Sequence, residues 1–155
     1  MTSISRQGIW IDCKALLPLT YQLISHLTNK DRILIGDRLV KINLDMIESF
    51  AMAYARGDEK LTFDRGNSYY EIEIKGCKRK EIDRLQSNFE HYKALWEFVF
   101  DNLDLQRWGD EKIKAKETEF IRLLAKIEIG ISKWKSGTAR QVVVSRKRHD
   151  ADQTL

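Results

Sequence analysis

The sequence contains few of the residues that interrupt regular secondary structure. Its 155 residues, the length of one domain, include one proline, Pro18, and eight glycines. So few turn-forming residues argue against a sandwich or barrel of many short strands and favour a few long helices. No segment approaches the 18 apolar residues of a membrane-spanning helix, so we expect no membrane association. Residues 1–14 show no basic segment followed by an apolar one, so we expect no secretory signal.

Cysteine and histidine are also scarce. Cys13 and Cys77 are too few for a disulfide framework or a cysteine-rich zinc module, and we expect a cytoplasmic protein. The three histidines, His26, His91 and His149, lack a Glu, Cys or second His at metal-ligand spacing. No glycine-rich phosphate loop or serine nucleophile turn occurs. The sequence therefore predicts a protein that is not an enzyme, with no catalytic residues, no metal and no cofactor.

The small excess of positive charge lies at one end of the chain. The formal net charge is +4, and basic and acidic residues balance over residues 1–132. Residues 133–155 contain six Lys or Arg against two Asp, and they carry the whole excess. A neutral body with a basic tail is typical of proteins that bind a polyanion, although such a tail can also serve solubility alone.

Apolar periodicity predicts four helices, over residues 13–29, 31–56, 78–105 and 110–135. For the first, Asp12 is the expected N-cap, and Pro18 is tolerated if the helix proper starts near Leu16. The third has the most regular stripe, with apolar residues three and four apart at Ile82, Leu85, Phe89, Tyr92, Trp96, Val99 and Leu103. Four helices joined by short links predict an all-α, antiparallel up-down four-helix bundle over residues 1–137.

Two segments depart from helical periodicity. Within an insertion at residues 58–79, apolar residues alternate with polar ones on both sides of Arg65-Gly66-Asn67, which predicts a small β-hairpin. A lone hairpin is marginally stable in water and has to lie against the helices or a partner. After Gly137 the periodicity ends, and residues 138–155 are expected to form a flexible basic tail with a short valine-rich patch.

Basic residues in two clusters are the candidates for binding nucleic acid, and they offer about five to eight phosphate contacts. The clusters contain Lys78, Arg79, Lys80 and Arg84, and then Lys133, Lys135, Arg140, Arg146, Lys147 and Arg148. The alternative is a solubilising tail together with ordinary surface lysines. Trp108, in the link before the fourth helix, is a candidate for a protein interface, since exposed tryptophans more often contact proteins than nucleobases.

Two helix segments resemble the Avd-like four-helix bundle family, which includes the accessory variability determinant of diversity-generating retroelements and the ribosomal RNA intervening-sequence proteins. The second helix begins DRILIGDRL and the fourth ends LLAKIEIGISKWKSG. The residues that carry the resemblance are Arg32, Gly36, Arg38 and Leu39, and then Glu128, Ile129, Gly130 and Trp134. The likeness covers residues 15–57 and 80–137, and residues 58–79 look like an insertion.

The resemblance implies a non-catalytic accessory subunit of a diversity-generating retroelement. Proteins of this family form a homo-oligomer, a pentameric barrel with a basic surface, and bind both a reverse transcriptase and template RNA to support mutagenic cDNA synthesis. Arg32 and Arg38 of the resembled motif join Trp108 as candidates for a partner interface, and Gly130 in the fourth helix allows a close helix approach. The alternative is a stand-alone RNA-binding or protein-interaction bundle of the intervening-sequence type.

Overall fold

The computed structural model describes residues 7–103, 105 and 109–149, and these form a predominantly helical fold with a small sheet. The helical elements are α1 (Gly8–Ser25), the short α2 (Asn29–Asp31), a π-helical turn (Arg32–Gly36), α3 (Asp37–Ala55), α4 (Arg79–Asn102) and α5 (Asp110–Ser136). The strands are β1 (Glu59–Asp64), β2 (Ser68–Lys75) and β3 (Gln141–Arg148).

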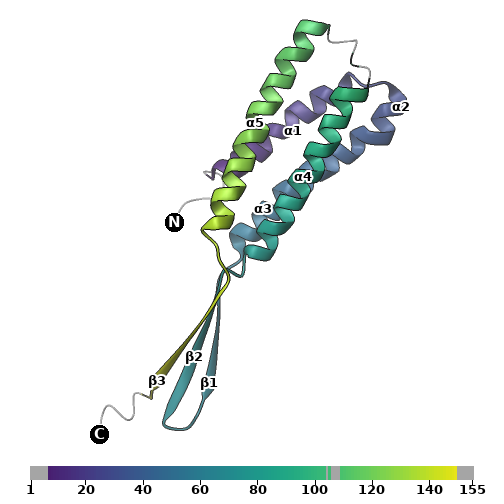
Figure 1. The fold of residues 1–155 in the computed structure, drawn as a ribbon. Helices are drawn as coiled ribbons and strands as arrows, with labels where there is room; N and C mark the ends of the chain where they lie inside the picture. Colours follow the sequence, from purple (N-terminus) through teal and green to yellow (C-terminus); the bar gives the residue numbers. More distant parts are fainter. Residues whose placement is uncertain (1–6, 104, 106–108, 150–155) are drawn as a thin grey trace.

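The four long helices pack side by side, and consecutive ones run in opposite directions (Figure 1). α1 contacts α3 and α5, and α4 contacts the same two helices from the other side. The prediction of four helices is therefore confirmed. The prediction of an all-α fold is wrong, because a three-stranded antiparallel sheet continues from one end of the helices (Figure 1).

The first helix begins earlier than predicted. It starts at Gly8 with Gln7 at the N-cap position, so the predicted start at residue 13 and the predicted Asp12 cap are wrong. Ile9 and Trp10 pack against the core, and this tertiary contact extends the helix toward the N-terminus. Pro18 lies inside the helix on its exposed side, where its ring does not disturb the packing of the buried face.

Two glycines let α1 approach its neighbours closely. A Cβ atom at Gly130 of α5 would lie 2.8 Å from Cγ1 of Ile9, which confirms the expected close helix approach there. A Cβ atom at Gly36, in the π-helical turn, would lie 3.1 Å from Cγ2 of Ile24. The helix predicted over residues 31–56 therefore begins with a wider, π-helical turn, at the point where it passes α1.

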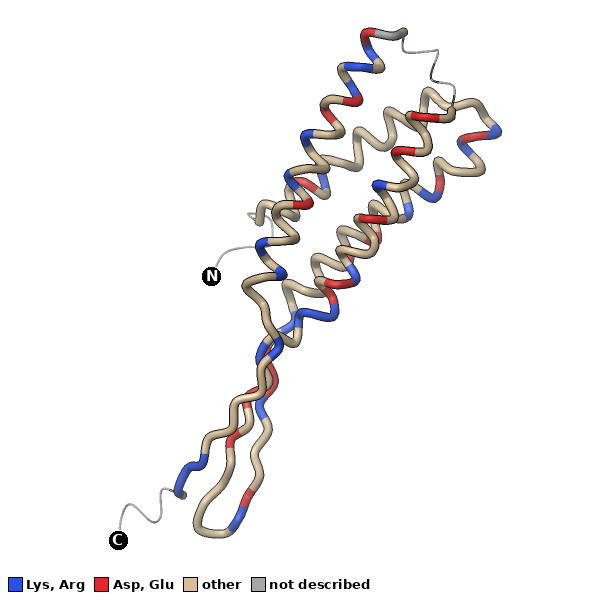
Figure 2. The backbone as a smooth tube through the Cα atoms, viewed as in Figure 1, with Lys and Arg blue, Asp and Glu red and all other residues tan. Residues whose placement is uncertain are grey.

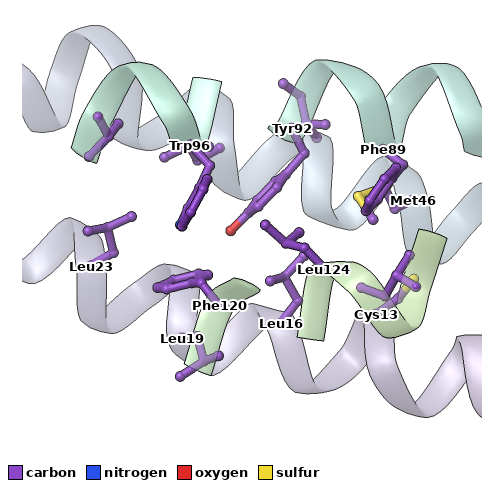
Figure 3. Close-up of a cluster of buried hydrophobic side chains, with 14 of the residues drawn as sticks. Cys13, Leu16, Leu19, Leu23, Met46, Phe89, Tyr92, Trp96, Phe120 and Leu124 are labelled. Atoms are coloured by element: carbon purple, nitrogen blue, oxygen red, sulfur yellow. The ribbon is translucent and has the colours of Figure 1, made fainter. Parts of the chain in front are cut away.

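The bundle core is formed by the predicted apolar stripes. Phe89, Tyr92 and Trp96 of α4 face side chains from α1 and α5 in Figure 3, and each is at least 94% buried. Each large side chain buried in this way contributes about 1.5–3 kcal/mol. The seam predicted for the third helix is confirmed from Ile82 to Val99.

A small polar network crosses this core. The Tyr92 and Thr20 hydroxyls lie 2.7 Å apart, and Thr20 Oγ1 donates to the Leu16 carbonyl at 2.8 Å or to Asn43 Oδ1 at 3.1 Å. Asn43 Nδ2 donates to the Cys13 carbonyl at 3.1 Å. The network joins α1, α3 and α4 and pairs polar groups that would be costly to bury alone. Burial raises the pKa of Tyr92 above its ordinary value and that of Cys13 to about 12, so both stay protonated.

The sheet has the order β1-β2-β3, with both pairs antiparallel. The predicted hairpin is confirmed as β1 and β2. The prediction of a flexible tail is wrong for residues 141–148, because they form β3 and pair with β2 from Lys75 to Ser68. The last residues of that predicted tail, 150–155, lie outside the described part of the chain.

The passage from α5 into β3 depends on Gly76. This residue has a φ of +73°, and a Cβ atom there would lie 2.4 Å from the Ala139 carbonyl oxygen. Its backbone N–H donates to Asp58 Oδ1 at 3.1 Å. The chain segments before β1, after β2 and before β3 therefore meet at one point, where the bundle ends and the sheet begins (Figure 1).

Candidate nucleic-acid interface

The two faces of the sheet differ in composition. In antiparallel strands, directly opposed residues point to the same face and successive residues alternate between faces. Phe63 therefore shares a face with Tyr70 and Arg146, which are in register with it across the three strands. We name this the apolar face; it contains Leu61, Phe63, Tyr70, Ile72, Ile74, Val142 and Val144, with Arg146 and Arg148 at its outer end.

The apolar face is exposed. Phe63 has 56% of its surface accessible, and Val142 and Val144 have 63% and 59%. These values belong to large apolar side chains that nothing in the described chain covers. Figure 1 shows the reason, since the sheet extends away from the end of the bundle instead of folding back on the helices.

The opposite face, which we name the charged face, neutralises its own charges. Lys147 Nζ lies 3.0 Å from Glu71, and Lys60 lies 3.8 Å from Glu71 and 3.5 Å from Glu73. The hydrogen bond from Lys147 lowers the pKa of Glu71 and raises that of Lys147. At the outer end of this face, His149 Nε2 lies 3.0 Å from Asp64 Oδ1, and this hydrogen bond lowers the Asp64 pKa.

The cations at the outer end of the apolar face have no such partners. Arg146 and Arg148 are exposed, and neither forms an ion pair within residues 7–103, 105 and 109–149. Arg65, in the turn between β1 and β2, places its guanidinium carbon 6.0 Å from the centroid of the Phe63 ring. Of the predicted tail cations, Lys147 is thus held by Glu71, and the two arginines remain available to a ligand.

Most of the other predicted basic residues gather where the bundle meets the sheet, and Figure 2 shows Lys and Arg concentrated there. Arg79 Nη1 donates to the Lys135 carbonyl at 3.1 Å, and Asp83 accepts from both Arg79 and Lys135 at 3.2 Å. Burial opposes ionisation of Asp83, but these two hydrogen bonds hold its pKa below the ordinary value. Arg79 and Lys135 therefore join α4 to the end of α5, which is a structural role.

Several cations at this junction are not neutralised. Lys80, Lys133 and Arg140 are exposed, and Lys78 lies 5.9 Å from the centre of the Trp134 ring. Arg84 is exposed and donates to Met52 Sδ at 3.7 Å. A hollow of about 340 Å³ lies here, lined by Arg56, Glu59, Ile74, Gly76, Cys77, Arg79, Lys80, Asp83 and Arg140. Arg56 pairs with Glu59 and Arg79 with Asp83, whereas Lys80 and Arg140 of this hollow form no ion pair with the described residues.

The residues expected at a partner interface lie at the other end of the bundle. Arg32 Nη2 donates to the Ser25 carbonyl at 3.4 Å, in the π-helical turn. Arg38 is exposed beside a hollow of about 290 Å³, lined otherwise by Asp31, Leu34, Ile35, Leu95, Phe98 and Leu103. This end is far from the sheet in Figure 1. Trp108, the third expected interface residue, lies outside the described residues.

No cluster of three or more His, Cys, Asp or Glu side chains suited to a metal ion occurs among the described residues. Cys77 Sγ donates to the Ile74 carbonyl at 3.2 Å, and Cys13 is fully buried. In the same part of the chain, no helix combines the length and apolar character needed to cross a membrane. Comparison of the chain with protein-family models, curated proteins and solved structures finds no match.

The sequence prediction missed the apolar face, because it assigned the hairpin and the tail to separate units. The signal was present in QVVVSRKR (residues 141–148), where three consecutive valines favour a strand. Which strand it pairs with depends on contacts between residues far apart in the sequence, such as Ser68 with Arg148. A sequence pattern does not indicate such a pairing.

Proposed function

We propose that this protein is a non-catalytic RNA-binding protein that binds phosphates along a surface running from the bundle–sheet junction to the outer end of β3. One observation supports this proposal most strongly. The charged face of the sheet balances its own charges, whereas the exposed cations Lys80, Lys133, Arg140, Arg146 and Arg148 form no ion pair in the described chain. A surface of unpaired cations attracts a polyanion and gives it salt-dependent affinity.

The resemblance to Avd-like proteins supplies the biological setting of the proposal. In that setting the protein is an oligomeric accessory subunit that binds a reverse transcriptase and template RNA. The exposed Arg38 and the adjoining apolar hollow favour a protein contact at the bundle end remote from the sheet. Several copies would also present several cationic surfaces to one RNA and raise its affinity through avidity.

Charge-removing variants test RNA binding. The double variant Arg146→Gln/Arg148→Gln should bind a structured RNA at least about tenfold more weakly near 0.1 M salt, and the salt slope should fall by about 1.4–1.8, from about 0.7–0.9 per phosphate contact. The matched control, Lys112→Gln/Lys114→Gln, removes the same charge from exposed positions of α5. Equal losses of RNA affinity in the two variants would show that only the net charge matters. That result would contradict a binding surface formed by particular residues.

The reverse transcriptase partner is tested separately, first by a search for a reverse transcriptase gene beside the gene for this chain and then by co-expression of the two proteins. We expect the two proteins to co-purify after nuclease treatment, and Leu34→Asp, beside Arg38, to abolish the association while leaving RNA affinity unchanged. RNA binding without any association would instead favour the stand-alone RNA-binding alternative.

A further inference from the structure

The apolar face is an exposed patch that the rest of the described chain does not explain. A three-stranded sheet normally covers one face with helices or a second sheet. Within the described chain neither face has such a cover, and one of them carries a continuous apolar surface with Phe63 and Leu61 more than half exposed. Contiguous exposed apolar surface of this kind marks a binding site.

Residues on this face form three cross-strand rows, about 7 Å apart along the strands. The outer row is Phe63, Tyr70 and Arg146; the middle row is Leu61, Ile72 and Val144; the row nearest the bundle is Glu59, Ile74 and Val142. Aromatic rings and guanidinium groups thus lie together at the outer end, where Arg65 and Arg148 add two more cations. Toward the bundle the face becomes aliphatic.

The charges on the face argue against a second copy of the chain as its occupant. Two copies packed face to face with their outer ends together would bring the arginines of both into contact. In the opposite orientation those arginines would meet Glu59 of the other copy, and Glu59 already pairs with Arg56 at 3.0 Å. The face carries Arg146 and Arg148 against one acid, Glu59, that is already paired, and this excess of positive charge favours an anion with apolar surface over a second copy.

A single-stranded nucleic acid combines these two properties. Its unpaired bases present flat rings that stack on aromatic side chains and guanidinium groups, and its phosphates pair with arginine. A double helix keeps its bases stacked internally and does not offer them to Phe63 and Tyr70. In the outer row, Phe63 and Tyr70 lie beside Arg146. One nucleotide can therefore stack its base on the rings while its phosphate pairs with the arginine.

We propose that the apolar face binds an unpaired RNA strand, with bases stacked on Phe63 and Tyr70 and phosphates held by Arg146 and Arg148. This inference rests on the proposed RNA-binding function and specifies its ligand as single-stranded. This mode of binding requires the rings of Phe63 and Tyr70. A variant that lacks both rings but keeps every charge should therefore bind single-stranded RNA more weakly.

The test compares a fluorescent single-stranded oligouridine 12-mer with a 12-base-pair RNA duplex, using the full chain. Phe63→Leu/Tyr70→Leu keeps the charge and an apolar face but removes both rings. We expect its affinity for oligouridine to fall at least about tenfold, with duplex affinity within about twofold of the unaltered protein. The control Tyr21→Leu removes an exposed ring from the bundle and should leave both affinities unchanged.

Different results separate the possible failures. If the unaltered protein binds neither probe, the proposed RNA-binding function is wrong. If it binds both equally and the Phe63→Leu/Tyr70→Leu variant is unaffected, RNA binding stands and the stacking platform is wrong. If that variant instead turns an oligomer into a monomer in sedimentation, without loss of oligouridine affinity, the face is a self-association surface and the platform is again wrong.

A second measurement does not depend on a folded variant. Photocrosslinking of 4-thiouridine oligomers to the unaltered protein should give adducts on Phe63 or Tyr70. Adducts confined to the helices would overturn the proposal.

Discussion

The bundle and the sheet differ in how they use apolar residues. In the bundle, Leu16, Leu39 and Met46 are fully buried and the helices stabilise one another. In the sheet, residues of similar character such as Leu61 and Val144 remain exposed, although the strands pair along their full length. The bundle thus buries its apolar side chains between helices, whereas the sheet is held by strand pairing and leaves its apolar face exposed.

The largest expected effect is on the bundle core. Trp96 packs against Phe100 and Phe120, with ring centroids 4.9 and 5.9 Å away. Trp96→Ala should lower the free energy of unfolding by about 3–5 kcal/mol, because it leaves a cavity that the helices fill only partly. Chemical denaturation followed by helical circular dichroism measures this.

The sheet supplies the matched control for that prediction. Phe63→Ala removes an exposed ring, and the same measurement should change by less than about 0.5 kcal/mol. A cost below about 1 kcal/mol for Trp96→Ala, close to that of Phe63→Ala, would contradict the contrast between the two regions.

The next effect is at the junction of the two regions. Gly76→Ala places a Cβ atom against the Ala139 backbone, in a conformation that costs other residues about 1–2 kcal/mol. We expect β3 to lose its pairing with β2 while the helices persist. Amide hydrogen exchange should then be fast in residues 141–148 and unchanged in α4. Gly66→Ala is a control, since its φ is also positive but nothing lies near its Cβ position.

A smaller loss is expected in the polar network of the core. Tyr92→Phe removes the hydroxyl that lies 2.7 Å from Thr20 Oγ1 and should cost about 1 kcal/mol in unfolding free energy. Tyr21→Phe, at an exposed position of α1, should cost nothing measurable. Equal losses of unfolding free energy in Tyr92→Phe and Tyr21→Phe would show that the network does not contribute to stability.

The smallest effect is a pH dependence confined to the sheet. The pKa values of Glu71 and Asp64 are lowered by their bonds to Lys147 and His149. A lowered carboxyl pKa stabilises the fold above the ordinary value near 4, and this contribution is lost as the pH falls through the folded-state value. Below about pH 4, the protection factors of the β2 and β3 amides, taken relative to the intrinsic exchange rate at each pH, should therefore fall before those of α4 do. Glu71→Gln should remove part of this dependence, and an unchanged profile would contradict the role of the ion pair.

Much of the helical fold was predictable, because it depends on local periodicity. The stripe from Ile82 to Val99 is buried as expected, and the hairpin follows from alternation around Gly66. The candidate interface was predictable only as a set of basic residues. Its division into structural cations such as Arg79 and available ones such as Arg146 depends on which acids lie nearby in space.

The parts that sequence reasoning missed depend on long-range contacts. The early start of α1 follows from the packing of Ile9 beside Gly130, and the π-helical turn lies where Gly36 meets Ile24. The pairing of β3 with β2 likewise joins distant segments and creates the apolar face. The glycine at position 130 and the valines of β3 did leave a local signal, but nothing in the sequence shows which distant residues they contact.

We propose that RNA binds the sheet and the adjoining junction, and that the rest of the bundle supports them. Hydrogen exchange of the full chain, with and without oligouridine, tests this most directly. The account predicts that RNA slows exchange in β1, β2 and β3, and leaves α1 and α3 unchanged. Protection confined to the bundle end near Leu34 and Arg38, with no change in the strands, would contradict it.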